Sequence, residues 1–345
     1  MKPTLAFIDH ELHQKTKSSD FLRELFKEHF EVHEYWDASW RGGPTVPPEE
    51  INKHDYVFYL QVINPFSDLK RIHIPILWAP MYDSFKPTAS YWRMISYFDI
   101  KILSFSKKMA EHFKKFDIPT MYVQYYYLKP EKSENPPGNH IFFWYRGGVE
   151  LSEICQVLDP SQVDSFTFLE APDKDGNLTQ ITEKDRELYK IKHMTGFLPR
   201  EEFLKLVRDA SIFVAPRKKE GIGAFTEPLA MGKTVIAFNE GVQNEYITDN
   251  VDGLLFDAQT ANIDLSGISS IPERAFERAS KGYLEWLKEK ERIIPFLREP
   301  YYARKRAVPI QIWKFFYWYN QFFGSIKYYI QHRFRERILP LWYNR

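Results

Sequence analysis

Short apolar runs alternate with amphipathic segments along the first 130 residues. Such runs suit strands of a parallel sheet, whose two faces are both covered. Residues 21–30 carry apolar side chains at 21, 22, 25, 26 and 30, which predicts a helix packed on that sheet, capped by Ser18 or Ser19. A second helix is expected to begin near Ser106. The predicted strands are 4–8, 32–36, 56–60, 75–79, 100–105 and 121–124.

The alternation restarts after a polar stretch, 131–139, that contains two prolines and a glycine and predicts a linker. The strands predicted beyond it are 141–145, 166–169, 191–194, 211–214, 234–238 and 253–256, and the helices are 150–158, 200–210 and 275–296. Strands spaced by helices predict an α/β fold of two doubly wound parallel-sheet domains facing a cleft. We expect domains at 1–134 and 139–298, a tail at 299–345, and ligands in the cleft.

Composition narrows the class of protein. The formal net charge is +1, which argues against general nucleic-acid binding, and the single cysteine, Cys155, excludes an intrachain disulfide and a zinc site built on thiolates. No window reaches the 18–20 apolar residues of a membrane span, and the apolar run at 4–8 is too short for a signal peptide. A cytoplasmic protein is expected.

The near-neutral total hides an uneven distribution of charge. Residues 301–345 hold nine Lys and Arg against one Glu, and 15 of these 45 residues are Phe, Tyr or Trp. A basic, aromatic, amphipathic segment favours peripheral contact with a membrane surface. The alternative is a helix that crosses back onto the first domain and buries its aromatic side chains there. Nucleic-acid binding by this tail has no supporting motif.

One segment, 215–233, combines features of a phosphate site. Gly221 and Gly223 let the backbone approach a ligand closely, and the N-terminus of the helix that follows attracts anions. Glu220 and Glu227 flank this turn, and carboxylates accept hydrogen bonds from sugar hydroxyls. Diphosphate recognition beside hydroxyl recognition is what a nucleotide-sugar requires.

The run Glu220-Gly-Ile-Gly-Ala-Phe-Thr-Glu227-Pro-Leu-Ala-Met-Gly resembles the donor-site signature of glycosyltransferase family 4, a group of GT-B-fold retaining enzymes. Flanking segments at 195–203, 244–247 and 252–257 are also similar to that family, and the resemblance covers residues 140–295. Arg146 stands where the family has a phosphate-binding arginine. The resemblance implies GT-B architecture, with the last helices crossing back to the first domain.

The resemblance also implies residue roles. Glu220 would contact the hexose, Glu227 the ribose and Arg146 the diphosphate, with Glu220, Arg146 and Asp83 as catalytic residues. Asp83 would act on the acceptor hydroxyl or, alternatively, cap the following helix. Glu245 is either a site residue or a helix-packing residue. The donor-binding set expected from the resemblance is Arg146, Gly196, Phe197, Leu198, Arg217, Lys218, Glu220, Gly221, Ile222, Gly223, Ala224 and Glu227.

The sequence departs from the family pattern at four places. Six residues rather than seven separate Glu220 from Glu227, and Pro228, which suits a first helical turn, replaces an alanine. The lysine that follows the phosphate-binding arginine is missing, so Lys192, Arg217 or Lys218 would supply its charge. The first domain lacks the family's histidine at 78–83.

The segment that leaves the first predicted strand is expected to open into the cleft. Its histidines, His10 and His13, have no matching cluster of ligands elsewhere, and we expect no metal site. Lys15, Thr16 or Lys17 would contact the donor phosphate or the acceptor, or belong to an ordinary polar loop.

The function that this resemblance implies is a retaining glycosyltransferase needing neither cofactor nor metal. It would move a hexose or deoxyhexose from a nucleotide-sugar, UDP- or GDP-linked, to a glycan or lipid-linked glycan acceptor at the cytosolic membrane face. The alternatives are a non-catalytic GT-B-like glycan-binding subunit and a GT-B-fold epimerase or phosphorylase.

Overall fold

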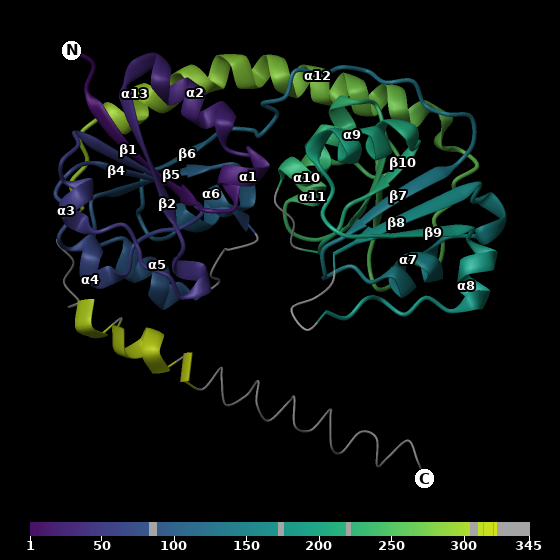
Figure 1. Ribbon diagram of the computed structural model, residues 1–345. Helices are drawn as coiled ribbons and strands as arrows, with labels where there is room; N and C mark the ends of the chain where they lie inside the picture. The colour runs from purple at the N-terminus through teal and green to yellow at the C-terminus, as the bar shows by residue number, and fades with distance from the viewer. Residues whose placement is uncertain are drawn as a thin grey trace, which may run out of the picture.

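The chain forms two parallel six-stranded sheets with helices on both faces, seen in a computed structural model that describes residues 1–82, 88–171, 176–218, 222–303, 310–312, 314–319 and 321–322 (Figure 1). The first sheet contains β1 (Thr4–His10), β2 (Glu31–Asp37), β3 (Tyr56–Leu60), β4 (Ile76–Ala79), β5 (Ile100–Ser104) and β6 (Thr120–Tyr122). The second contains β7 (His140–Tyr145), β8 (Ser165–Glu170), β9 (Ile191–Thr195), β10 (Ile212–Val214), β11 (Thr234–Phe238) and β12 (Leu254–Phe256). The predicted two-domain α/β fold is confirmed.

The helices follow the strands in alternation. Those of the first half are α1 (His13–Thr16), α2 (Asp20–His29), α3 (Pro48–Ile51), α4 (Phe66–Leu69), α5 (Ala89–Ile95) and α6 (Lys107–Lys114). Those of the second half are α7 (Leu151–Val157), α8 (Glu183–Leu188), α9 (Arg200–Asp209), α10 (Gly223–Ala230), α11 (Gln243–Tyr246), α12 (Ile271–Glu289) and α13 (Ile293–Arg298). The shortest of them, of four residues, carry no hydrophobic period that the sequence could reveal.

The inner strands are buried on both faces, as their apolar runs predict, whereas the edge strands β2 and β9 are partly exposed. In β1, Leu5 and Phe7 pack into one core, and Ala6 and Ile8 pack into another on the opposite face of the sheet. Successive side chains of a strand point to opposite faces, so one apolar run supplies both cores.

The two sheets differ in strand order. The first runs β2-β1-β3-β4-β5-β6, and the second runs β12-β11-β10-β7-β8-β9. In each, the order reverses beside the strand that comes first in the chain, at β1 next to β3 and at β7 next to β10. Ligands of doubly wound folds bind outside the carboxyl ends of the strands at such a point.

Two local predictions are wrong. The expected helix at 275–296 is instead α12, a 3₁₀ turn at Lys290–Arg292 and then α13. Pro295 has no N–H to donate to the carbonyl of Glu291, so a continuous α-helix is disfavoured there. Ser19 takes the N-cap position of α2 without a side-chain capping bond, whereas Ser106 does cap α6, because its Oγ accepts from the Met109 amide at 3.1 Å.

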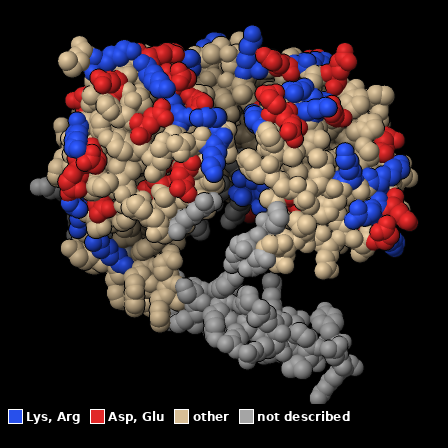
Figure 2. Space-filling view, in the orientation of Figure 1, with Lys and Arg blue, Asp and Glu red and all other residues tan. Residues whose placement is uncertain are grey.

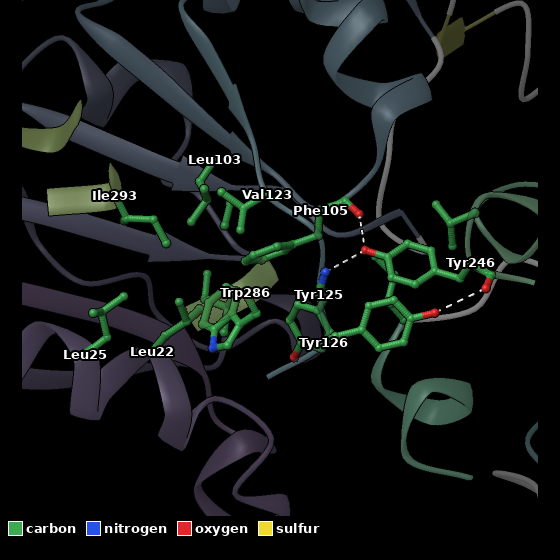
Figure 3. Packing of buried hydrophobic residues seen from close by; sticks show 14 of the residues in the cluster. Leu22, Leu25, Leu103, Phe105, Val123, Tyr125, Tyr126, Tyr246, Trp286 and Ile293 are labelled. Carbon is green, nitrogen blue, oxygen red and sulfur yellow. Dashed lines mark hydrogen bonds between the residues drawn. The ribbon is translucent and has the colours of Figure 1, made fainter. Parts of the chain in front are cut away.

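The carboxyl ends of the two sheets meet through one shared core. Tyr246 of the second domain is fully buried against the first domain, and its hydroxyl donates to the Phe105 carbonyl at 2.6 Å and accepts from the Tyr125 amide at 2.8 Å (Figure 3). The Tyr126 hydroxyl donates to the Tyr246 carbonyl at 3.2 Å. The helix α12 spans the top of both domains in Figure 1, and its Trp286 contacts Phe21 of α2. As expected, the last helices return to the first domain.

Residues 310–312, 314–319 and 321–322 are helical and lie below the first domain in Figure 1. Ile310 and Tyr317 pack against that domain, where the Tyr317 ring contacts those of Phe66 and Tyr91. The remaining predictions for the tail fall on residues outside the described ones. In the part of the chain that is described, no helix combines the length and the apolar character that a membrane crossing demands.

Candidate functional site

Two loops meet at the strand-order reversal of the second sheet. One follows β7 and contains Gly147 and Gly148, both with positive φ, and the other follows β10 and contains Arg217 and Lys218. A Cβ on Gly148 would lie 3.6 Å from both the Arg217 Cα and the Lys218 amide nitrogen, so the loops are in contact. Nothing lies within 4 Å of a Cβ on Gly147, so the backbone of the first loop leaves room for a ligand at the carboxyl ends of β7 and β10.

Arg146 directly follows β7 and is exposed beside these loops. Its guanidinium carbon lies 4.6 Å from the centroid of the Trp144 ring, a cation–π contact that orients the side chain. Trp144 packs in one small cluster with Leu198 and Phe203. Arg146 thus lies close to the loop after β9, where the sequence places Gly196, Phe197 and Leu198.

Glu170, a buried residue that was not predicted from the sequence, holds the loop after β9 in place. Glu170, at the end of β8, is 2 % exposed and accepts hydrogen bonds from His193 Nε2 at 2.7 Å and from the hydroxyl and amide of Thr179. Its backbone carbonyl accepts from the Gly196 amide at 2.9 Å. Gly196 has a φ of 109°, and the neighbouring Phe197 is 77 % exposed, which leaves an aromatic face free to stack on a ring.

The helix α10 begins at Gly223 beside this point. Its N-cap residue, Ile222, makes no side-chain capping bond with the described residues, and the first N–H groups of a helix have no intrahelical acceptor. Ile222 is buried in the core shared by the two domains and fixes the start of the helix, and Ala224 is part of the first turn. Pro228 lies inside α10 and not in its first turn, because the helix starts earlier than the sequence suggested.

Three of the predicted site residues, Glu220, Gly221 and Asp83, lie outside the described residues. Their predicted roles stay predictions.

Glu227 projects from α10 toward α9. Its side chain is 12 % exposed and forms an ion pair with Arg200. Burial raises the pKa of Glu227, and Arg200 opposes that shift by favouring the ionised form. The carboxylate is therefore already oriented, with a cation beside it.

The three candidates for the missing positive charge are not equivalent. Lys192 lies in β9, an edge strand two strands away from β7, while Arg217 and Lys218 lie at the reversal point itself. The Lys218 ammonium bonds Glu153 at 2.5 Å and lies 5.0 Å from the Phe238 ring centroid. Gln243 Nε2 donates to the carbonyls of Arg217 and Lys218, at 2.9 and 3.2 Å, and so fixes the loop. Figure 2 shows Lys and Arg atoms on the walls of the hollow between the domains.

Glu245 does not face this site. Its carboxylate accepts from the Ser106 hydroxyl at 2.9 Å and from the amides of Lys107 and Lys108 at 2.6 and 3.0 Å. Glu245 thus caps the N-terminus of α6 in the other domain. Of the two alternatives, the structure favours the packing role.

His10 ends β1 and His13 begins the short helix α1, and the ring centroids of the two histidines lie 5.7 Å apart. Within the described ranges, no group of three or more His, Cys, Asp or Glu side chains is placed to hold a metal ion. Lys15, Thr16 and Lys17 are exposed, and the Thr16 hydroxyl lies 3.0 Å from that of Ser18.

The sequence and the structure were both compared with those of known proteins. Residues 181–266 match the family model described as "Glycosyl transferases group 1". No curated protein matches the chain. Among solved structures, the chain is similar to a glycosyltransferase from Rickettsia africae ESF-5, with 13 % identity, a TM-score of 0.57, and coverage of 86 % of this chain and 98 % of the other.

Two further structures share this architecture. One is Anabaena Alr3699/HepE in complex with UDP and glucose, with 13 % identity, a TM-score of 0.53, and coverage of 86 % of this chain and 99 % of the other. The other is sucrose-phosphate synthase (tll1590) from Thermosynechococcus elongatus, with 11 % identity and the same TM-score and coverage. The chain therefore has the GT-B fold, and residues 181–266, which surround the candidate site, carry the sequence pattern of the group 1 glycosyl transferases.

Proposed function

We propose that this protein is a retaining glycosyltransferase that moves a hexose or deoxyhexose from a nucleotide-diphosphate sugar to a glycan or lipid-linked glycan. One observation carries the proposal: Arg146, Arg217 and the start of α10 follow β7 and β10, the two strands between which the strand order reverses, and residues 181–266 match the group 1 glycosyl transferases. Cations and free N–H groups at one point form a diphosphate site.

Each part of the site has a role in this reaction. As the bond between the sugar and the diphosphate breaks, negative charge grows on the diphosphate, and Arg146, Arg217 and the N–H groups of Gly223 and Ala224 stabilise it. The sugar passes through an oxocarbenium-like state. We propose that no metal is needed, because these groups already balance the leaving charge.

The nucleoside would bind along the loop after β9. Phe197 offers an exposed ring to the base, and Glu227, oriented by Arg200, accepts hydrogen bonds from the ribose hydroxyls. Glu220 would contact the hexose, as the family pattern implies. A uracil base is our first choice, because the similar Anabaena structure is described with UDP.

A thermal-shift panel of UDP-, GDP-, dTDP- and CMP-sugars with EDTA present tests this function. A ligand at a hundred times its dissociation constant stabilises the folded state by about 2.7 kcal/mol, which shifts a melting curve visibly. One clear hit identifies the donor, and Glu220→Ala is expected to bind it with an unchanged melting temperature of the free protein but without transfer. Silence across the panel favours the non-catalytic subunit.

We also propose that the tail helix brings the enzyme to a membrane surface. While Ile310 and Tyr317 face the first domain, Phe315, Trp318, Tyr319 and Phe322 are 43–60 % exposed. Their spacing places them along one side of the helix, and the tail as a whole is basic. The expected partner is a bilayer with anionic lipids at the cytosolic face.

Flotation with vesicles containing 30 % phosphatidylserine tests the membrane proposal. Trp318→Ser combined with Phe322→Ser should abolish flotation while the melting temperature stays unchanged. Leu284→Ser is the matched control, because Leu284 is 59 % exposed on α12 and is distant from the tail. Equal flotation of both variants would contradict the proposal.

A further inference from the structure

The short helix α11 is bonded to the first domain through most of its length. It lies on the side of the second domain that faces the first (Figure 1). Besides the cap that Glu245 provides for α6, the Lys108 ammonium donates to the Gly241 carbonyl at 2.8 Å and bonds Asn244 Oδ1. Tyr246 is buried in the core that the two domains share. The position of α11 is therefore set by the first domain as well as by its own.

The remaining side chain of α11, that of Gln243, bonds the proposed anion site instead. It is fully buried, and its Nε2 donates to the carbonyls of Arg217 and Lys218 at 2.9 and 3.2 Å. Its Oε1 is buried and has no partner among the described residues. Within that part of the chain, the hydrogen bonds of the Gln243 side chain are thus made to the loop after β10 alone. They join this loop to the helix that bonds the first domain.

The bond from Gln243 fixes the direction of a backbone N–H in that loop. A trans peptide directs its C=O and its N–H to opposite sides, so holding the Arg217 carbonyl against Gln243 turns the Lys218 N–H away from α11. The Lys218 amide nitrogen lies 3.6 Å from where a Cβ on Gly148 would be, beside the loop after β7. Among the described residues, this N–H donates no hydrogen bond. Backbone N–H groups held in this way bind anions.

We propose that α11 makes the affinity of the loop after β10 for a diphosphate depend on the contact between the domains, with Gln243 as the positioning residue. The inference rests on the anion site of the proposed function. While α11 is bonded to Lys108 and α6, Gln243 stays against the loop and the Lys218 N–H stays directed at the anion. Without these bonds the loop carbonyls turn toward the anion and repel it. The dependence is reciprocal, so a bound diphosphate stabilises the contact between the domains.

The sign of the expected effect distinguishes this link from direct electrostatics. Glu245 carries a negative charge, so its removal would strengthen anion binding if charge alone mattered. The link predicts the opposite, because Glu245→Ala removes the acceptor for the Ser106 hydroxyl and for the first amides of α6 and so loosens α11 from the first domain. Diphosphate binding then weakens although a negative charge has been removed.

The test is titration calorimetry of the full-length protein with inorganic pyrophosphate. Gln243→Met removes the two donated bonds and keeps an unbranched side chain, and it should raise the Kd by about 10-fold. Glu245→Ala should raise the Kd by about 5-fold. In the double variant Glu245→Ala should add nothing to the effect of Gln243→Met, because the link is already broken. Gln156→Met, at an exposed glutamine of α7, is the matched control and should stay within about 2-fold of the wild type.

Melting curves accompany each titration, and Gln243→Leu and Glu245→Gln take the place of any variant that does not fold. An unchanged Kd in Gln243→Met overturns the proposal. So do effects of the two substitutions that multiply in the double variant, tighter binding by Glu245→Ala, or a wild type that binds no pyrophosphate. A wild type that binds pyrophosphate with the expected variant effects, but binds no sugar nucleotide of the panel, supports the link and refutes only the proposed function.

Discussion

The cleft edges of the two domains differ in chemistry although both are built from parallel sheets. At the first domain, the strand-order reversal carries titratable side chains, Asp9 and His13, in contact with each other. At the second domain, it carries glycines of positive φ, two arginines and a helix N-terminus. One edge carries a buried carboxylate bonded to a histidine, and the other carries groups suited to holding an anion.

The transfer site proposed above would be divided between the two domains. Such a site needs the two domains to keep a fixed relative position. At each of the two points where the chain crosses between the domains, one buried lysine bonds the crossing segment. The segment that enters the second domain bonds to Lys233, whose ammonium donates to the Glu134 carbonyl at 3.1 Å, Asn135 Oδ1 at 2.9 Å and the Arg208 carbonyl at 2.8 Å.

The helix that returns to the first domain is held by a second buried lysine. Lys101 of β5 donates to the carbonyl of Leu297 at 3.2 Å and also bonds those of Phe296 and Glu299, at the end of α13. Lys101 and Lys233 are 2 % and 0 % exposed, and burial lowers the pKa of both. Each domain thus uses one buried ammonium to hold the chain segment that arrives from the other.

The largest effects are expected from removing these anchors. Lys101→Met and Lys233→Met each leave carbonyl oxygens without a donor, and we expect each to lower the free energy of unfolding by about 2–3 kcal/mol. Denaturant melts measure the change. Lys132→Met is the control, because Lys132 is 44 % exposed beside the same linker. A loss in only one of the two variants would show that the crossings are not equivalent.

The buried Lys233 also predicts that the free energy of unfolding depends on pH. Burial lowers the pKa of Lys233 to about 8, below the 10.5 of an exposed lysine. Between pH 8 and 10.5 the unfolded chain therefore binds a proton that the folded one lacks, so the contribution of Lys233 to stability rises with pH over this window. The difference in unfolding free energy between wild type and Lys233→Met should grow from pH 8 to pH 10. A constant difference would contradict the lowered pKa.

The next largest effect concerns the packing of α12 across the domains. A Cβ at Gly282 would lie 2.1 Å from Cδ2 of the buried Tyr126, whose hydroxyl bonds Tyr246. Gly282→Ala gains about 1 kcal/mol of helix propensity but overpacks this contact, and we expect a net loss of about 1–2 kcal/mol in unfolding free energy. Gly267→Ala is the control, since nothing lies within 4 Å of its added Cβ. A stabilised Gly282→Ala would show that propensity outweighs packing.

The anion-binding character of the second domain is tested by Arg146→Ala. Losing a charged hydrogen-bond donor should raise the Kd for the sugar nucleotide by about 10- to 100-fold, as titration calorimetry would measure. Lys192→Ala, on the edge strand β9, should leave the Kd within about 2-fold. Equal effects of the two substitutions would point to a diffuse positive field rather than a site at β7 and β10.

The sequence predicted the elements with a clear hydrophobic period and the fold that they build. It also singled out the segment 215–233 as the proposed donor segment, because glycines, carboxylates and a helix start are adjacent in the chain there. It missed the contact between Asp9 and His13, since the hydrogen bond that joins them depends on the turn after β1. Glu170 was missed for a related reason: its partners Thr179 and His193 come from other parts of the chain.

Long-range contacts explain the remaining differences. Only the folded chain shows that Arg200 is the partner of Glu227, or that α10 begins early enough to place Pro228 inside it. The same holds for Glu245, which lies in a segment similar to the donor domain of a family and yet bonds the first domain. Sequence similarity can assign a residue such as Glu245 to a known segment, but only the packed structure shows which neighbouring group its side chain contacts.

The smallest expected effect is on the direct contact between the two edges. Glu245→Ala removes the acceptor for the Ser106 hydroxyl and the first amides of α6, and the loss of such a cap costs about 1 kcal/mol. Glu245→Gln keeps an oxygen acceptor without the charge, so its loss in unfolding free energy should be smaller. The control is Glu277→Ala, an exposed glutamate on α12. If Glu245→Ala unfolds like the control, the domains do not depend on this cap. They are then held together by Tyr246, the core around it and the two lysine anchors.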